Sequence, residues 1–546
     1  MLEPRKIPPV LVYGIPIFLA GALKLLVWSP QVTPFNADEA IVALMARHIN
    51  QGQLMPFFYG QSYMGSFDAI LVALFFKLFG ESVWIIRLVQ CLLYLGTVAT
   101  TIMLGARLLG SSRKALYAGL LVAIPPVNVT LYSTVSLGGY GEMLLMGNLL
   151  LLSGWRLLDE LQWEESFSRN GRLFGWFFWS IGAGLAFWVI GLSLVYTIPV
   201  LLILIWEILQ SSKTKKAIIF KFGIVAVLGF LVGSAPWWIS AVATGNGSIL
   251  TELLGGAIAD VNSNISLLKP MIRIRNLLVF GGTVITGIRP PWGISWLMLP
   301  LIPFVLTFWI AVLISSGNQL LKTRNRGFVL LFLIGIVLSM GFILAPYGDD
   351  PSGRYFLPLV LPMAILGSEF ISRGARGNLL IEWGLIALVL IFNLGGTLQS
   401  RLTIPPGLTT QFDPVAQVDQ RYTGELLMFL GDQNITTGYS NYWVSYPVAF
   451  LSEEQIIFSP RLPYHQDFRY TERDDRYLPY TEQVESSDEI AYIVTRHPAL
   501  EAYLQERFGE LGISWEEKRI GDYTVYYDLT APVHVNEIGL GTTTLP

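Results

Sequence analysis

Residues 327–346 read GFVLLFLIGIVLSMGFILAP, a run without a single charged side chain. A helix needs about 20 mostly apolar residues to cross the hydrocarbon core of a membrane. Three Lys or Arg residues lie just before this run, in 322–326, and none lies in 347–353 after it. The stretch therefore predicts a transmembrane helix that begins on the cytoplasmic side, where short loops are rich in Lys and Arg.

The composition of the whole chain fits many such helices. Of 546 residues, 53% are hydrophobic and 14% charged, whereas soluble domains carry roughly 25% charged residues. The net charge of −3 does not indicate a nucleic-acid-binding protein. Cys91 is the one cysteine, which excludes an internal disulfide and a Cys-based metal site. Four scattered histidines do not indicate a His cluster.

Eleven apolar runs are long enough to span a membrane. They are 9–29, 83–108, 114–132, 139–158, 173–190, 192–209, 217–240, 292–315, 327–346, 354–371 and 379–397. The first run lacks a convincing cleavage site, so it is predicted to be an anchor and not a removed signal peptide.

The short loops predict the orientation of these spans. With a cytoplasmic N-terminus, the Lys and Arg residues of the short loops fall on the cytoplasmic side, whereas loops 133–138 and 347–353 carry none. The cytoplasmic set is Arg107, Arg113, Lys114, Arg156, Arg169, Arg172, Lys213, Lys215, Lys216, Lys322, Arg324, Arg326, Arg373 and Arg376. The pattern also supports the number of spans, because one helix more or fewer would disturb the alternation.

The predicted fold is thus a polytopic α-helical membrane protein with about eleven transmembrane helices and a small C-terminal extracytoplasmic α/β domain. Its parts are a transmembrane domain over 1–397, outer loops over 30–82 and 241–291, and the soluble domain over 398–546. In that last part, strand-like runs at Ala491–Thr495 and Tyr523–Leu529 surround a helical stretch near Pro498–Gly509.

The first outer loop predicts two amphipathic helices on the membrane surface, each with carboxylates at its start. One follows Asn36 and carries Asp38 and Glu39, and the other runs from Ser66 to Phe79 with Asp68 in its first turn. Plain capping explains these residues well, since Asn36 with Glu39 forms a capping box and carboxylates suit helix N-termini. The turn at 59–65 between the helices is rich in hydroxyl, amide and aromatic groups, which are typical of sugar sites.

Further charged residues recur on the same outer face. Glu142 begins a spanning helix, where a carboxylate is costly unless it faces a cavity, a partner or the helix dipole. Arg354 opens a late helix and fits either a phosphate or a nearby carboxylate. Lys269, Arg273 and Arg275 in the second loop indicate either an anionic ligand or a solvated surface.

Over roughly residues 10–375 the sequence resembles the C-type (GT-C) membrane glycosyltransferases. There it is similar to protein O-mannosyltransferases and lipid-A aminoarabinose transferases. Three short motifs carry the resemblance by their order and shared outer face: Asn36–Ala40, Leu78–Leu88 and Gly353–Pro358. Where many relatives have a His-Pro-Pro-like start to the second surface helix, this chain has Tyr63–Asp68, which puts the acceptor type in doubt.

The resemblance implies transfer of a hexose or pentose from a polyprenyl-phosphate donor to a glycan, lipid or protein acceptor at the outer face, with inversion. It makes Asp38 the general base, with Glu39 assisting it, and Arg354 the first candidate for the donor phosphate, ahead of Arg273 and Arg275. The residues expected to orient hydroxyls or line the sugar site are Tyr59, Gln61, Tyr63, Asp68, Tyr140, Glu142 and Tyr355. No ligand set has diagnostic metal spacing, so a divalent cation stays open.

Two other classes of protein stay in view. A transporter or flippase for a lipid-linked saccharide typically shows internal repeats and polar sites at mid-membrane, and this sequence shows no repeat. A non-catalytic scaffold that presents the C-terminal domain leaves the acidic first loop with no role beyond capping. For the transferase, the expected location is the plasma membrane of a bacterium.

Overall fold

The structure is a computed structural model that describes residues 7–162, 169–210, 216–244, 268–350, 352–403 and 407–542. Lys213, Lys215 and positions 245–267 of the second outer loop lie outside the described residues. The chain forms two compact units. The helical unit comprises Met1–Leu26, Tyr63–Asp68 and Leu88–Ser400, and the mixed unit comprises Val27–Ser62, Ala69–Arg87 and Arg401–Pro546.

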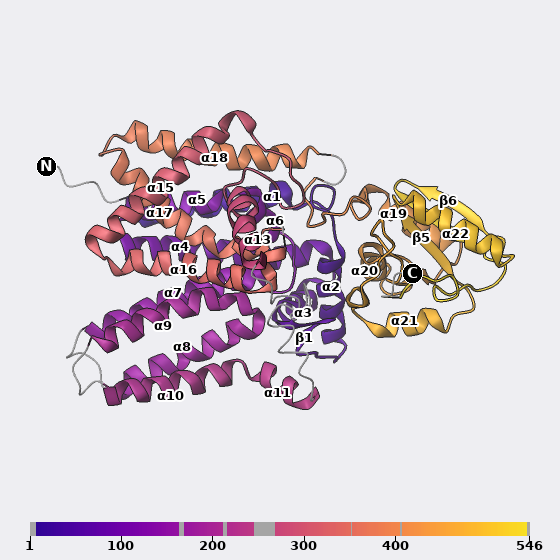
Figure 1. The fold of residues 1–546 in the computed structure, drawn as a ribbon, viewed down its shortest axis with the longest axis horizontal. Helices are drawn as coiled ribbons and strands as arrows, with labels where there is room; N and C mark the ends of the chain where they lie inside the picture. Colours follow the sequence, from indigo (N-terminus) through magenta and orange to yellow (C-terminus); the bar gives the residue numbers. More distant parts are fainter. Residues whose placement is uncertain are drawn as a thin grey trace. The chain divides into compact units, whose positions relative to one another are not determined.

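The helical unit is built almost entirely of helices that run side by side (Figure 1). They are α1 (Pro9–Val27), α4 (Val83–Leu109), α5 (Ser112–Ala123), α6 (Val127–Tyr132), α7 (Tyr140–Gln162), α8 (Arg169–Val189), α9 (Leu194–Leu209), α10 (Lys216–Gly233), α11 (Ala235–Thr244), α13 (Leu268–Asn276), α14 (Gly282–Ile285), α15 (Ile302–Thr323), α16 (Arg326–Leu344), α17 (Val360–Gly374) and α18 (Leu379–Arg401). Short 3₁₀ or π turns join several of them: η1 (Gly191–Ser193), η5 (Leu277–Gly281), η6 (Leu299–Leu301), η7 (Pro346–Asp349) and η8 (Arg354–Leu359).

Seven helices in the described part of the chain are long and apolar enough to cross a membrane, or eight if one bent pair counts as a span. The seven are Pro9–Val27, Val83–Leu109, Gly191–Leu209, Leu299–Thr323, Arg326–Leu344, Arg354–Gly374 and Leu379–Arg401. The bent pair joins Lys221–Gly233 to Ala235–Ala243 at 66°. The chain is therefore an integral membrane protein, and the count of eleven spans stays a prediction.

Two predicted spans differ plainly from the structure. The span expected over 292–315 runs instead over Leu299–Thr323. A single helix was expected over 114–132, but α5 ends at Ala123 and α6 begins at Val127. Pro125 and Pro126 stand between them, and proline both lacks a backbone N–H and disfavours helical geometry in the residue before it. The apolar run did not predict this break, because the residues on both sides of it are hydrophobic.

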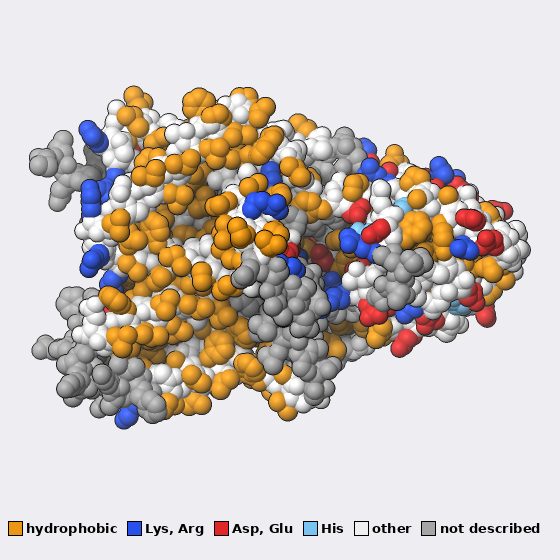
Figure 2. Space-filling model, in the orientation of Figure 1, with side chains coloured by type: hydrophobic (Ala, Val, Ile, Leu, Met, Phe, Trp, Pro, Cys, Tyr) orange, Lys and Arg blue, Asp and Glu red, His pale blue; other side chains and the backbone are white. Residues whose placement is uncertain are grey.

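The packing and the surface of the helical unit both suit a lipid environment. Helices α8 and α10 pack so closely that a Cβ on Gly184 would lie 2.2 Å from the carbonyl oxygen of Phe230, and glycines of this kind let membrane helices approach. Large apolar side chains such as Val242 and Leu380 are exposed, and hydrophobic side chains cover much of the visible surface of these helices (Figure 2).

The mixed unit joins most of the first outer loop to the C-terminal region. From the loop come α2 (Ala37–Asn50), β1 (Phe57–Phe58), the start of β2 (Gln61–Gly65) and most of α3 (Phe67–Phe79). The C-terminal elements are η9 (Gln420–Tyr422), α19 (Thr423–Asp432), β3 (Thr437–Tyr439), α20 (Tyr442–Leu451), β4 (Ile457–Ser459), η10 (Glu472–Asp474), α21 (Leu478–Glu485), β5 (Ala491–Thr495), α22 (Pro498–Glu510), β6 (Glu516–Ile520) and β7 (Tyr523–Tyr527).

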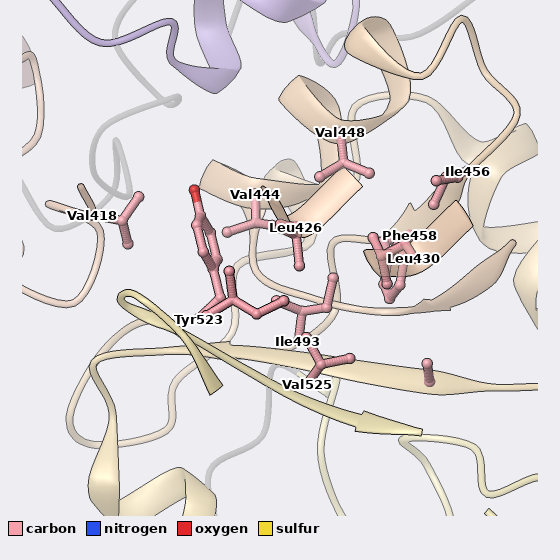
Figure 3. Packing of buried hydrophobic residues seen from close by; sticks show 12 residues of the cluster. Val418, Leu426, Leu430, Val444, Val448, Ile456, Phe458, Ile493, Tyr523 and Val525 are labelled. Carbon is pink, nitrogen blue, oxygen red and sulfur yellow. The ribbon is translucent and has the colours of Figure 1, made fainter. Parts of the chain in front are cut away.

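Five strands form one sheet in the order β4-β3-β5-β7-β6. Strand β3 pairs in parallel with β4 and β5, whereas β7 pairs antiparallel with β5 and β6. Apolar residues of α19, α20 and the sheet form the core, among them Leu426, Val444 and Ile493 (Figure 3). The strand-like runs read from the sequence are β5 and β7, and the helical stretch between them is α22.

Candidate active site

The start of α2 carries two adjacent carboxylates with different surroundings. Asn36 caps the helix, because its side chain accepts a hydrogen bond from the Glu39 backbone N–H at 2.9 Å. The Glu39 side chain is fully buried, and both of its oxygens bind the guanidinium of Arg87, at 2.9 Å and 2.8 Å. A capping box would turn Glu39 back toward Asn36. In the structure the carboxylate forms a bidentate ion pair with Arg87.

Arg87 also holds the chain that leads into α2. Its Nη1 donates to the Trp28 carbonyl oxygen at 2.5 Å, and Nη2, which also binds Glu39, donates to the Pro34 carbonyl oxygen at 3.4 Å. The pair of Glu39 and Arg87 therefore fixes the approach to α2 as well as its first turn. These contacts give Glu39 a structural position at the start of α2.

Asp38, in contrast, is half-buried and has one engaged oxygen. The hydroxyl of Tyr442 donates to Oδ1 of Asp38 at 2.5 Å. Tyr442 is 2% exposed and begins α20, which Asn441 caps through a bond from the Trp443 N–H. Burial raises the pKa of Tyr442 well above its ordinary value, and repulsion by the Asp38 carboxylate raises it further. Tyr442 therefore stays protonated and acts as a donor. Among the described residues, Oδ2 of Asp38 accepts no hydrogen bond.

Arg476 and Asp474 complete the charged cluster around Asp38. The Arg476 guanidinium lies over the Tyr442 ring, 5.5 Å from its centroid, and donates to the Gly60 carbonyl oxygen at 3.2 Å. Burial raises the pKa of Asp474 to about 7, with Arg476 opposing and Asp38 adding to the rise. The Tyr446 hydroxyl donates to the Asp474 carbonyl and accepts from the Arg476 N–H. These bonds fix the backbone of this charged segment.

Two predicted sugar-lining residues of the first loop bind other protein groups. With the Gln61 amide turned so that its oxygen faces Arg476, that oxygen accepts from both terminal nitrogens at 2.7 Å and 2.8 Å. The Tyr59 hydroxyl lies 2.8 Å from Nδ1 of His48, and the Tyr59 ring stacks on Tyr477. Both polar tips are thus engaged by other protein groups in this structure, and their part in a sugar site stays a prediction.

His48 belongs to a buried network within the mixed unit. Its Nε2 lies 3.0 Å from Oε1 of Glu454, which also accepts from the Tyr480 hydroxyl at 2.6 Å. Burial alone would raise the pKa of Glu454, but bonds from His48, Tyr480 and Arg47 outweigh it and lower that pKa to about 2. Glu454 is thus an anion that ties α2 to α21.

In the helical unit, Asp68 and Glu142 form a second acidic site. Both are 1% exposed. Ser136 and the Gly138 N–H donate to Oδ2 of Asp68, at 2.7 Å and 3.1 Å. The Gln90 amide lies within 3.1 Å of Asp68 and 3.4 Å of Glu142. Burial raises the pKa of Asp68, so a proton on this pair avoids two adjacent buried charges.

Arg354 lies in an aromatic cluster of the same unit. It forms an ion pair with Asp350 at 2.6 Å and lies over the Tyr355 ring, 5.1 Å from the centroid. Tyr347 packs between Tyr355 and Tyr63, with centroids 4.9 Å and 6.5 Å away. The Tyr355 hydroxyl and Nε of Arg354 are buried without a hydrogen-bond partner among the described residues. Tyr63, Arg354 and Tyr355 therefore lie in one cluster, and their roles in binding a sugar or a phosphate stay predictions.

The other predicted phosphate ligands lie differently. Arg273 is 2% exposed and forks onto Asp349 at 3.2 Å and 3.0 Å, so it is paired with an aspartate, as Arg354 is with Asp350, and its role at a phosphate stays a prediction. Arg275 is exposed and contacts Asn276. Tyr140 is buried against Tyr132. In the described ranges, no group of three or more His, Cys, Asp or Glu residues is arranged to hold a metal ion.

Sequence reasoning missed Tyr442, Arg476 and Asp474. They come from the C-terminal region and meet Asp38 only through the tertiary fold. A local signal did exist in the sequence. Between Tyr470 and Tyr477, five of the six residues are charged, which is an unusually high density of charge. Nothing in the sequence paired that segment with residue 38.

Comparison with known proteins gives the class to which this fold belongs. The chain is 25% identical over 332 residues to an undecaprenyl phosphate-alpha-4-amino-4-deoxy-L-arabinose arabinosyl transferase of Pseudomonas aeruginosa, covering 59% of this chain and 53% of the relative. A transferase of the same name from Pseudomonas fluorescens is 25% identical over 317 residues, covering 56% and 50%. The chain thus spans about half the length of the curated relatives it matches. No protein-family model matches it.

Solved structures agree with this class. ArnT from Cupriavidus metallidurans bound to undecaprenyl phosphate matches with a TM-score of 0.59 and 12% identity, over 95% of this chain and 98% of that one. The archaeal oligosaccharyltransferase AglB from Archaeoglobus fulgidus matches with a TM-score of 0.52 and 12% identity, over 88% and 69%. The fold is therefore that of the GT-C membrane glycosyltransferases, and the chain is similar to the aminoarabinose transferases among them.

Proposed function

We propose that this protein transfers a sugar from a polyprenyl-phosphate donor to a hydroxyl-bearing acceptor, with Asp38 as general base. The observation that carries the proposal is the state of Asp38: one oxygen is held by Tyr442 and the other accepts no hydrogen bond within the described part of the chain. Capping does not require Asp38, because Asn36 already caps α2. A half-buried, oriented carboxylate with an accessible oxygen is suited to take a proton from an alcohol.

The proposed reaction follows from the chemistry of the donor. Asp38 removes the acceptor hydroxyl proton as the oxygen attacks the anomeric carbon, and the bond from that carbon to the phosphate oxygen breaks. Attack opposite to the leaving phosphate inverts the anomeric centre. Negative charge then grows on the departing phosphate, and a preorganised cation stabilises it. Arg354 is assigned this role, because its planar fork suits phosphate and aromatic rings hold it.

Other residues support these two. Tyr442 and Arg476 orient Asp38 and set its charge environment, while Glu39 and Arg87 hold the α2 terminus in place. Tyr63 and Tyr355 offer aromatic faces for a sugar ring beside Arg354. Asp68 and Glu142, which share the Gln90 amide as a partner, place two polar side chains that can orient a hydroxyl. The sugar class, hexose or pentose, and the acceptor follow from no single residue.

The proposal includes a topology. We place the N-terminus in the cytoplasm, the Lys/Arg-rich helix ends on that same side and the mixed unit outside, with eleven spans in a bacterial plasma membrane. The support is the alternation of basic loops with loops such as 347–353 that carry no Lys or Arg. Sugar transfer to an extracytoplasmic acceptor requires this sidedness.

The test is transfer by the purified full chain in proteoliposomes. Radiolabelled polyprenyl-phosphate pentoses and hexoses would be offered with a bacterial envelope fraction as acceptor. We expect labelled acceptor and released polyprenyl phosphate for one sugar class. Movement of intact lipid-linked sugar between leaflets without transfer would contradict the proposal and identify a flippase. The absence of both transfer and movement with every donor would also contradict the proposal and would favour a scaffold.

A further inference from the structure

A groove along α15 and α17 lies in the helical unit, and none of the residues assigned above lines it. Its volume is about 470 Å³. Six residues of α15 line it together with Arg373 of α17: Ala311, Ile314, Ser315, Asn318, Gln319 and Lys322. Successive members of this set are one or three residues apart. This spacing keeps all six on one face of the helix, so they form one stripe.

The stripe changes character along its length. Ala311 and Ile314 are apolar, Asn318 and Gln319 are amides, and Lys322 with Arg373 supplies two cations at the basic end. At about 1.5 Å per residue the stripe is roughly 16 Å long, about half of a hydrocarbon core of roughly 30 Å. The gradient from apolar to amide to cationic groups therefore extends over one leaflet.

The polar groups of the groove are open to a ligand. Lys322 and Asn318 are exposed, and in the described ranges Lys322 forms no ion pair and the Asn318 amide no hydrogen bond. The Arg373 side chain is 53% exposed. An acidic neighbour, Glu369, lies 3.9 Å from Arg373 and accepts from the Gln319 amide at 3.4 Å.

Glu369 does not cancel the positive charge of the groove. It is 5% exposed, and its other oxygen forms an ion pair with Lys114 at 2.5 Å. One anion thus lies among three cations, which leaves a net positive site. Exposed cations at the end of a spanning helix attract anionic lipid headgroups.

We propose that this groove binds an anionic phospholipid of the leaflet on the Lys/Arg-rich side. The phosphate lies between Lys322 and Arg373, the ester oxygens meet the amides of Asn318 and Gln319, and the acyl chain follows Ala311 and Ile314. Basic pockets between spanning helices on the cytoplasmic side suit such headgroups. A zwitterionic lipid binds more weakly, because its own cation is repelled. This site does not depend on the proposed transferase activity.

The test compares lipid retention by purified full-length variants. Wild type in detergent would be titrated with phosphatidylglycerol or phosphatidylcholine and bound lipid read by native mass spectrometry. We expect a preference for phosphatidylglycerol, and Lys322→Gln or Arg373→Gln each to weaken its binding about fivefold. Lys322→Arg, which conserves the charge, should retain binding.

Arg107→Gln is the matched control. Arg107 is an exposed basic residue in the last turn of α4 and does not line the groove, so its loss should leave retention unchanged. Equal weakening by Arg107→Gln would overturn the proposal in favour of a diffuse basic surface. Unchanged binding by the Lys322→Gln/Arg373→Gln double variant, or equal retention of the two lipids by wild type, would also overturn it.

Discussion

The hydroxyl of Tyr442 lies 2.5 Å from Oδ1 of Asp38, although 404 residues separate them in the chain. The bond joins the first turn of α2 to the first turn of α20, within the mixed unit. It orients the carboxylate that we propose as base, and it gives the C-terminal region a part in the chemistry.

Replacing Tyr442 by Phe removes the hydroxyl and keeps the ring. A hydrogen bond to a charged group contributes about 1.5–3 kcal/mol, so we expect the transfer rate to fall about tenfold or more. Because the lost bond positions the carboxylate, the loss should appear in kcat, with KM near the wild-type value. Tyr439→Phe, which removes a hydroxyl bonded to His534 from strand β3 of the same unit, should leave kcat in place. An unchanged kcat in Tyr442→Phe would refute the positioning role.

Breaking the pair of Glu39 and Arg87 should destabilise the protein. Both side chains are almost fully buried, and removing one partner of such a pair typically costs about 3–5 kcal/mol. We expect Glu39→Gln to lower the apparent melting temperature of the purified chain clearly. The double variant Glu39→Met/Arg87→Met should lose less than the sum of its single variants. Additive losses would show that the two side chains do not act as a pair.

Asp474 predicts a pH-dependent stability. Burial raises its folded-state pKa to about 7 from 3.8, so the folded state binds the proton more tightly. The stabilising contribution is complete below about pH 4, decreases as the pH rises and is lost above about pH 7, on the order of 4 kcal/mol. We expect wild type to melt at a lower temperature at pH 8 than at pH 5, and Asp474→Asn to flatten this dependence. An equally steep dependence in the variant would contradict the assignment.

Two neutral replacements of Asp68 should change the melting temperature by different amounts. Burial raises its pKa, so Asp68→Asn, which is also neutral and polar, should change the melting temperature little. Asp68→Leu leaves the Gly138 N–H and the Ser136 hydroxyl without their acceptor and should cost about 3 kcal/mol. Equal effects of the two variants, read by thermal unfolding, would exclude a polar role for this site.

The local features of the site could be read from the sequence. Asn36 was expected to cap the helix that carries Asp38, and α2 does begin at Ala37. The amphipathic stretch after Ser66 forms α3, and Gly353–Pro358 places Arg354 beside Tyr355. These features depend on neighbours in the chain, where helix signals and turn residues are strong.

The remaining features depend on partners that only the folded chain brings together. The bidentate pairing of Glu39 with Arg87 joins residues 48 positions apart, and no local pattern predicts it. The pairing of Arg273 with Asp349 likewise joins distant segments of the chain. Hydropathy identified the spanning segments but not the proline break between α5 and α6.

The most direct test of the central claim is the transfer rate of Asp38→Asn. The amide keeps the size of the side chain and can still accept from Tyr442, but it cannot take a proton. General base catalysis contributes roughly 10²–10⁴-fold, so we expect sugar transfer from the polyprenyl-phosphate donor to fall at least about 100-fold. Donor binding and melting temperature should stay near wild type, as should transfer by the control Asp432→Asn at an exposed position in α19. Transfer by Asp38→Asn at the wild-type rate would contradict the assignment of the base.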